Sequence, residues 1–343
     1  MSELKQKLLD QGMLALGNCN PDLAAKFFAK ALELDEIDTD TMDALADALV
    51  QCGRGDEARP LLETSARLQP DRNPAKWFYL AQLQHSEDAL RSLNSGVDAL
   101  LRVGDHSDPA VRAQLGKAFA SVAELFLTDL CFAPDAERRC EEAVEQSLRH
   151  HPEGIDGRLA LTSLRLSQSR TPEAALTVEQ VFHDVMAVRQ RLAQRSIIQE
   201  MQSSMEEVDV EAVESDVCLA LAKLLLECAA SKPDLLLAAA ELLEDLLLDD
   251  DEQPEVHYLL GVALAGEFPE DPTPAAEHFE AARALLERQP NEEDTELLAA
   301  VREHLKDIAE GRPVQFSGCR LSEAGERHSM EDEEWSEEED EET

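Results

Sequence analysis

Carboxylates are the most abundant reactive groups in this sequence, and three of them are regularly spaced. Asp40, Asp43 and Asp47 lie at i, i+3 and i+7, so a helix would place them on one face. Three like charges on one face destabilise a helix unless cations offset them. Their chemistry is therefore ion pairing with lysine or arginine, and we interpret the cluster as a binding surface for a basic ligand. An ordinary solvated face of a very acidic protein is the alternative.

Residues for catalysis or for cofactor binding do not form a recognisable motif. The sequence has no Gly-rich phosphate loop, no HExxH, no GxSxG and no CxxC pair. His150 and His151 are adjacent before a proline, and His257 and His278 lack a third ligand in the pattern. We therefore expect no enzyme activity, no cofactor and no metal. The seven cysteines, an odd number, are typical of reduced thiols in the cytoplasm or the nucleus.

The whole chain is acidic, with 73 Asp and Glu against 31 Lys and Arg and a formal net charge of −42. Residues 331–342 contain ten of these acids and no base, so most of the excess belongs to the rest of the chain. Such a body repels nucleic acid and anionic membranes, and it attracts a basic protein. No apolar stretch is long enough to predict a membrane span. We therefore expect a basic protein as the partner, and neither nucleic acid nor a membrane.

The elements that position these residues follow from an internal repeat. The pattern AxxxFxxA at residues 24–31 is followed thirty-four residues later by AxxxL at 58–62. Thirty-four residues is the period of the tetratricopeptide repeat, a pair of antiparallel helices. Gly12 and Ala46 each stand twelve residues before the alanine that begins one of these patterns. A small residue at that place lets the two helices approach closely.

This repeat predicts an all-α fold, a tetratricopeptide-type right-handed superhelical solenoid of about seven helix pairs with a C-terminal capping helix. After the first two pairs, we expect the helices and the cap at residues 77–81 and 89–101, 111–130 and 136–149, 156–167 and 172–201, 217–229 and 233–248, 258–261 and 275–282, and 293–308. The solenoid is predicted over residues 1–311, with a flexible acidic insertion at about 206–216. Residues 312–343 contain little apolar surface and are predicted to be a disordered acidic tail.

In such a solenoid the first helix of each pair lines an inner groove. Its inward positions in the later pairs hold four further acids that we predict to bind the partner: Asp129, Asp156, Asp216 and Glu255. Exposed ion pairs contribute only about 0–1 kcal/mol each, so specificity requires apolar anchors. Phe78 and Tyr258 occupy inward positions and are the candidates, with Trp77 beside them. Packing between helices is the alternative for all three.

Three segments carry a more specific resemblance: KWFYLAQL at residues 76–83, LTDLCFAPDAERRCEE at 127–142 and LTSLRLSQ at 161–168. Together they resemble the assembly chaperones of large-subunit ribosomal protein L4, over residues 4–308. The resemblance implies a tetratricopeptide solenoid that captures newly made L4 and shields its long basic internal loop. It further implies delivery of L4 to the pre-ribosome in the nucleus. We expect a monomer in a 1:1 complex, in both cytoplasm and nucleus.

Two other functions stay open at this point. A generic tetratricopeptide scaffold of a multi-subunit complex would use its acidity for solubility, and an unrecognised hydrolase would act without the motifs named above. A groove that grips the acidic C-termini of major chaperones is excluded, because such grooves use Lys and Asn on their inner face. The first repeat has Leu9 and Met13 at these positions, and the second has Asp43 and Asp47.

Overall fold

The computed structural model describes residues 2–201, 213–288, 291 and 294–314. These described residues form fifteen α-helices and no strand. In chain order the helices are α1 (Ser2–Gly17), α2 (Pro21–Leu32), α3 (Thr39–Gln51), α4 (Gly55–Leu68), α5 (Ala75–Gln82), α6 (Ser86–Val103), α7 (Pro109–Leu127), α8 (Ala136–His150), α9 (Ile155–Ser167), α10 (Thr171–Met201), α11 (Ser215–Cys228), α12 (Leu235–Asp249), α13 (Pro254–Glu267), α14 (Thr273–Arg288) and α15 (Thr295–Ala309).

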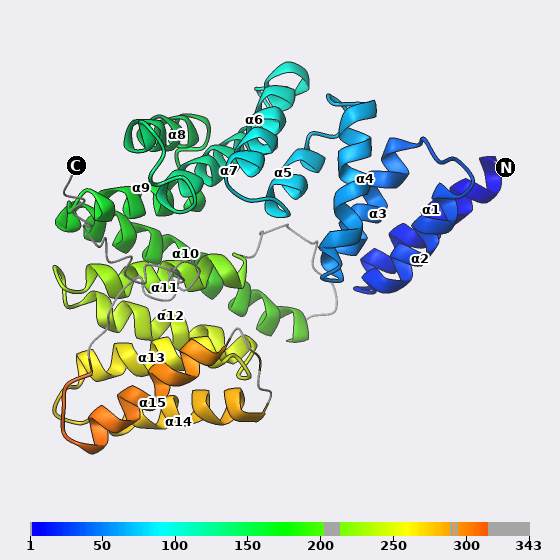
Figure 1. Ribbon diagram of the computed structural model, residues 1–343. Coiled ribbons are helices and arrows are strands. Elements are labelled where there is room, and N and C mark those ends of the chain that lie inside the picture. Colours follow the sequence, from blue (N-terminus) through cyan, green and yellow to red (C-terminus); the bar gives the residue numbers. More distant parts are fainter. Residues whose placement is uncertain (1, 202–212, 289–290, 292–293, 315–343) are drawn as a thin grey trace, which may run out of the picture. The chain divides into compact units, whose positions relative to one another are not determined.

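Consecutive helices pack as pairs (Figure 1). α1 packs on α2, α3 on α4, α5 on α6 and α7 on α8, and each of these pairs contacts the helix that follows it. Further along the chain α11 packs on α12 and α13 on α14, and α15 covers α14. The described residues thus confirm the predicted all-α fold: six of the seven predicted helix pairs pack together, and α15 lies on the last pair as a capping helix would.

The chain forms two compact units, and the boundary between them lies between Val181 and Phe182, inside α10. Unit 1 contains α1–α9 and the start of α10, and unit 2 contains the helices that follow. All described helices lie within the solenoid range predicted at 1–311. The acidic insertion was predicted at about residues 206–216, and its part up to residue 212 lies outside the described residues. Its last two residues, Ser215 and Asp216, are the first two residues of α11. The predicted acidic tail lies outside them from residue 315 onward.

The helices of the first and last repeats approach each other at a glycine. Gly12 on α1 lies so close to Phe28 on α2 that an added Cβ would overlap the aromatic ring. Gly261 on α13 lies against Phe279 on α14, where an added Cβ would be 2.7 Å from Cε1. Both rings are fully buried. The spacing that predicted the repeat thus corresponds to an aromatic ring packed over a glycine.

Short polar side chains followed by proline fix two of the helix starts. Asn20 accepts a hydrogen bond from a backbone N–H three residues on (3.1 Å), and Pro21 begins α2. Asp108 accepts one from the N–H of Ala110 (2.9 Å), and Pro109 begins α7. Such caps satisfy amide groups that the first turn of a helix leaves without a partner.

The apolar core of unit 1 continues from repeat to repeat. One cluster joins α1 to α5 around Ala46 and Leu62, and another joins α5 to α9 around Ala123 and Phe126. Each repeat therefore buries its apolar face against its neighbours, as a stacked array requires. Among the described residues, no helix is both long and apolar enough to cross a membrane.

Gly12→Ala should destabilise the protein, because the added methyl group would have to displace the ring of Phe28. Overpacking of this kind costs about 1–3 kcal/mol of unfolding free energy. Gly17→Ala on the same helix is the matched control, since nothing lies within 4 Å of its added Cβ. Alanine should favour the helix there by up to about 1 kcal/mol. Chemical denaturation followed by circular dichroism measures both variants, and equal midpoints would contradict the packing argument.

Candidate partner-binding surface

The three acids predicted to bind the partner from the second repeat all lie on α3, in three different environments. Asp40 is about half exposed and pairs with Arg72, whose Nε donates to Oδ1 (2.7 Å). Asp47 is partly buried and accepts a hydrogen bond from Gln51 (3.2 Å). It also lies beside Tyr79, whose pKa is raised by burial and by the charge of Asp47. That the partner contacts these two acids stays a prediction.

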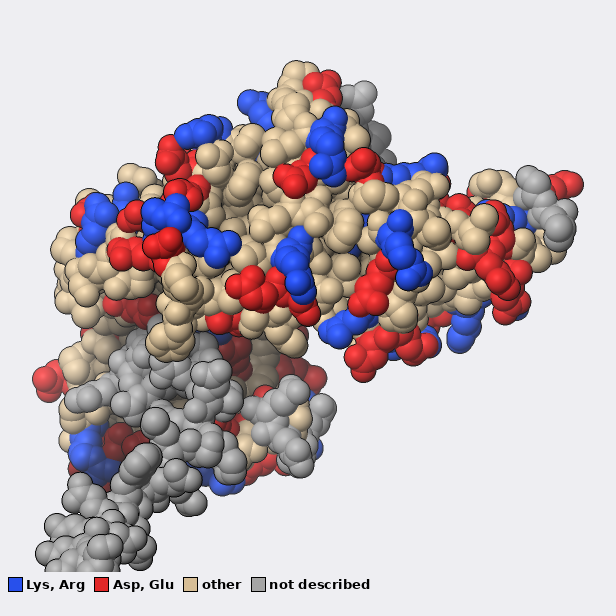
Figure 2. Space-filling view, turned by 45° about the horizontal axis from the view of Figure 1, so that its top comes forward, with Lys and Arg blue, Asp and Glu red and all other residues tan. Residues whose placement is uncertain are grey.

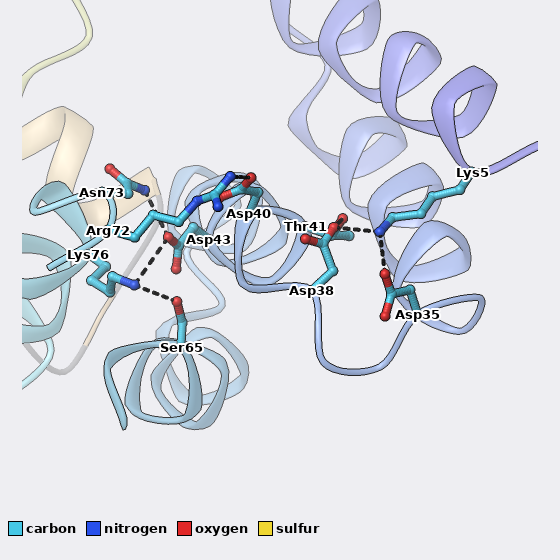
Figure 3. A network of polar contacts seen from close by, with 10 residues as sticks. All are labelled: Lys5, Asp35, Asp38, Asp40, Thr41, Asp43, Ser65, Arg72, Asn73 and Lys76. Carbon is cyan, nitrogen blue, oxygen red and sulfur yellow. Dashed lines mark hydrogen bonds and ion pairs between the residues drawn. The ribbon is translucent and has the colours of Figure 1, made fainter. Parts of the chain in front are cut away.

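Asp43 is buried, with only 7% of its surface exposed. It accepts a hydrogen bond from Asn73 (2.9 Å), and its Oδ2 lies 3.6 Å from the ammonium of Lys76 on α5 (Figure 3). Lys76 is completely buried and donates to Ser65 Oγ on α4 (2.8 Å) and to the carbonyl of Gln69 (2.9 Å). Asp43 thus joins α3, α4 and α5 inside the protein. The prediction of three accessible acids on one face of α3 is therefore corrected: two of them are accessible, and the third is buried.

Burial disfavours the charged form of both partners in this pair. Desolvation raises the pKa of Asp43, although Ser65, Asn73 and the charge of Lys76 oppose the rise. Desolvation also lowers the pKa of Lys76, and the nearby carboxylate of Asp43 opposes that fall. Asp43 Oδ1 is buried without a hydrogen-bond partner. The pair is therefore a structural contact whose two charges depend on each other.

Acids and bases elsewhere in unit 1 also pair between consecutive repeats. Lys5 on α1 pairs with Asp35 (2.7 Å) and Asp38 (2.8 Å), just before α3 (Figure 3). Arg102 on α6 pairs with Asp71, just before α5 (2.6 Å). Figure 2 shows Lys and Arg side chains lying beside Asp and Glu on one face of this unit. A basic ligand would compete with these internal bases, so carboxylates without a base are better placed to receive it.

Of the remaining predicted acids, two have partners within the chain. α7 ends at Leu127, so Asp129 follows the helix instead of lying on its inner face, which corrects the predicted position. Asp129 accepts a hydrogen bond from the backbone N–H of Ser86 (2.9 Å) at the start of α6. Glu255 on α13 pairs with Lys223 on α11 (2.8 Å). Asp216 begins α11 and is exposed, with no partner among the described residues.

Tyr258, predicted as an aromatic anchor, is only 6% exposed. Its ring stacks on His304 of α15 (5.7 Å between centroids) and lies tilted against Phe279. Its hydroxyl lies 3.3 Å from His304 Nε2. Trp77, named beside the anchors, donates its indole N–H to the carbonyl of Pro70 (2.9 Å). For Tyr258 the structure corrects the anchor prediction to the alternative, packing between helices.

Phe78 lies in a different setting, at a pocket between α5, α6 and α7. The pocket has a volume of about 350 Å³ and remains open to solvent. Gly96 on α6 holds the ring from behind, because an added Cβ would lie 2.6 Å from Phe78 Cε1. The polar groups that line the pocket with Phe78 are Gln82, Gln84, Gln114, Lys117, Ser121, Glu124 and Thr128. Of the two predicted anchors, Phe78 is thus the one that a partner can reach.

Glu124 is a pocket residue that the repeat register did not identify. It is the only acid in α7, and it stands between apolar residues, a pattern that singles it out in retrospect. Glu124 is exposed on α7, and partial desolvation by its neighbours raises the pKa of its carboxyl. The charge of Asp156, a predicted partner-binding residue on α9, raises that pKa further. Neither carboxylate has an ion-pair or hydrogen-bond partner among the described residues.

Phe78 and Glu124 thus line one pocket, and the charge of Asp156, a second predicted site residue, acts on Glu124. An aromatic ring and a carboxylate in one pocket, with a second negative charge acting on that carboxylate, are suited to receive a cation. A metal site is a separate matter: the described residues contain no group of three or more His, Cys, Asp or Glu arranged to hold a metal ion.

Lys76→Met should strongly destabilise the protein, since it leaves the carboxylate of Asp43 buried without its cation. Removing one member of a buried pair costs about 3–5 kcal/mol of unfolding free energy. Arg72→Met is the matched control, because it breaks the exposed pair with Asp40, where about 0–1 kcal/mol is expected. Urea denaturation compares the two. A loss below about 1 kcal/mol for Lys76→Met would show that the pair does not hold α5 in place.

No family model matches the chain. Two curated proteins, each named "Probable assembly chaperone of rpl4", are similar to it in sequence. The one from Schizosaccharomyces pombe is 28% identical over 200 residues, which is 57% of this chain and 53% of the relative. The one from Emericella nidulans is 27% identical over 291 residues, which is 79% of this chain and 69% of the relative. The alignment thus spans about half the length of the first relative.

Solved structures support the fold. "Assembly Chaperone of RpL4 (Acl4) (Residues 1-338)" superposes with a TM-score of 0.58 and 23% identity, covering 76% of this chain and 95% of that one. A tetratricopeptide repeat protein from Parabacteroides merdae superposes with a TM-score of 0.54 and 12% identity, covering 89% and 98%. The resemblance predicted from the sequence is confirmed: the chain is a tetratricopeptide-type helical solenoid, related in sequence to proteins named probable assembly chaperones of rpl4.

Proposed function

We propose that this protein is a dedicated chaperone of a basic ribosomal protein, large-subunit protein L4. The observation that carries the proposal is the similarity to two proteins named for this role, which in one of them extends over 291 residues. The name belongs to those proteins, and its transfer to this chain is the proposal. The protein acts by binding and shielding, and it needs neither catalysis, nor a cofactor, nor a metal.

The charge of the chain suits this function. A free basic protein binds RNA without selectivity, because its lysines and arginines displace counterions from the phosphates. A chaperone with a net charge of −42 offers competing negative charge and does not itself attract RNA. Among the carboxylates of unit 1, Asp47, Glu124 and Asp156 are at least partly accessible and have no ion pair with a base of the described residues, so they can serve this purpose.

The complex is proposed to contain one chaperone and one L4 molecule. The chaperone meets newly made L4 in the cytoplasm and accompanies it to the nucleus, where the large subunit is assembled. A functional fluorescent fusion of the protein tests the two locations, and confinement to one compartment would exclude the accompanying role.

Co-expression with L4 from the same organism tests the function. We expect L4 to remain soluble and to co-purify with this protein at a 1:1 ratio at moderate ionic strength. A second basic large-subunit ribosomal protein of similar net charge is the control for unspecific attraction, and its binding should disappear as salt rises while L4 binding persists. Salt weakens long-range attraction between exposed charges more than it weakens desolvated contacts.

The outcomes separate the two functions. Failure to bind L4, together with stable capture of a different partner, would favour the generic tetratricopeptide scaffold. Equal binding of L4 and the control protein would mean that the acidity acts only as an unspecific counterion.

A further inference from the structure

The pocket at Phe78 offers an incoming chain more than negative charge. The ring of Phe78, which Gly96 holds from behind, lines the pocket together with Glu124. The amide side chains of Gln82 and Gln114 also line the pocket, and both remain accessible. An aromatic face, a carboxylate and amide oxygens together match the groups that a flat cation with several N–H donors can use.

We propose that this pocket binds an arginine side chain of the basic partner, with the guanidinium on Glu124 and against the ring of Phe78. The inference rests on the function proposed above and adds the residue type that the pocket selects. Arginine is favoured over lysine because its guanidinium stacks on aromatic rings and presents five donors in a fixed plane. An ammonium group is a strongly hydrated point charge and gains less from the ring and the amides.

The charges around the pocket agree with a single cationic guest. Glu124 and Lys117 are the charged residues of the lining, and Lys117 is engaged in an interaction of its own. Asp156 adds its negative charge from α9, close enough to affect Glu124. The negative charges of Glu124 and Asp156 thus outnumber the one lysine of the lining, which is already engaged. Elsewhere in unit 1, the accessible acid Asp40 is already paired with Arg72.

The ionised form of Glu124 is disfavoured in the free protein, to an extent that solvent limits because the residue is exposed, and a bound guanidinium would favour that form. Its pKa is raised in the folded state by desolvation and by Asp156, so the fold disfavours its ionised form. Below the unfolded-chain pKa, both states are protonated and stability is unaffected. Above the raised folded-state pKa, both states are ionised, and the folded state bears the penalty. At neutral pH, Glu124→Gln should therefore leave the unfolding midpoint of the free protein unchanged or raise it slightly.

Glu124→Gln should at the same time weaken binding of L4 by about tenfold or more, since it removes the carboxylate that receives the guanidinium. Glu63→Gln is the matched control. Glu63 is exposed on α4, has no partner among the described residues and lies outside the pocket, so its loss should change affinity by less than about threefold. Isothermal titration calorimetry measures both variants. A purely structural role for Glu124 would lower stability and affinity together.

The preference for arginine can be measured without L4. Hexa-arginine and hexa-lysine peptides carry the same charge, so unspecific attraction binds them alike. We expect wild-type protein to prefer hexa-arginine by about fivefold or more, and Glu124→Gln and Phe78→Leu to lose that preference. Equal affinity of wild-type protein for the two peptides would overturn the proposal.

Together the two experiments distinguish a failure of the pocket proposal from a failure of the proposed function. If L4 binds wild-type protein and Glu124→Gln equally well, the pocket proposal fails while the proposed function stands. If L4 does not bind, but hexa-arginine is preferred in a Glu124-dependent manner, the pocket stands and its partner is a different basic protein.

Discussion

Two helices of one repeat can pack closely only where one of them has almost no side chain, and the rest of this structure depends on that constraint. Gly12 receives Phe28 in the first repeat, and Gly261 receives Phe279 in the last. In the third repeat the partners are exchanged, because the glycine is on the second helix and the ring of Phe78 is on the first. The same contact that stacks the array thus leaves one face of that ring open to a pocket.

The acidity of the chain can be interpreted only when the positions of its lysines and arginines are known. Taken as composition, −42 describes a protein that attracts any cation. In unit 1, however, Lys5, Arg72, Lys76 and Arg102 each pair with an acid from a neighbouring repeat or from the segment that joins repeats. These pairs hold successive helices together and leave accessible negative charge at particular places. Selectivity for a partner can therefore come from the distribution of the few bases, more than from the number of acids.

Sequence patterns predicted the helices well, because the residues that define the repeat contact each other within one helix pair. Ala24, Phe28 and Ala31 are buried together, as their spacing indicated. Exposure of single side chains was harder to predict, since it depends on the neighbouring repeat. Asp43 is covered because Lys76 comes from the next pair, and Tyr258 is covered by the capping helix.

The prediction for Asp129 failed for a related reason. The inward positions were counted at a fixed spacing from the start of each repeat. In the fourth repeat the first helix begins at Pro109 and ends at Leu127, so the position counted to Asp129 falls beyond the end of the helix. Glu124 was missed by the same register, although its isolation among apolar neighbours marks it. When a repeat is longer or shorter than thirty-four residues, a fixed spacing assigns the wrong residues to the inward positions of its helices.

The hydrogen bond between Asp129 and Ser86 joins residues 43 positions apart and has a consequence for how the array unfolds. Asp129 follows the first helix of the fourth repeat, yet it caps the second helix of the third. A fragment that ended before Asp129 would contain every residue of the third repeat and still leave the backbone N–H of Ser86, at the start of α6, without this acceptor. The repeat that is visible in the sequence is therefore not an independent folding unit. Neighbouring repeats are thermodynamically coupled, and melting at this junction is expected to be shared between them.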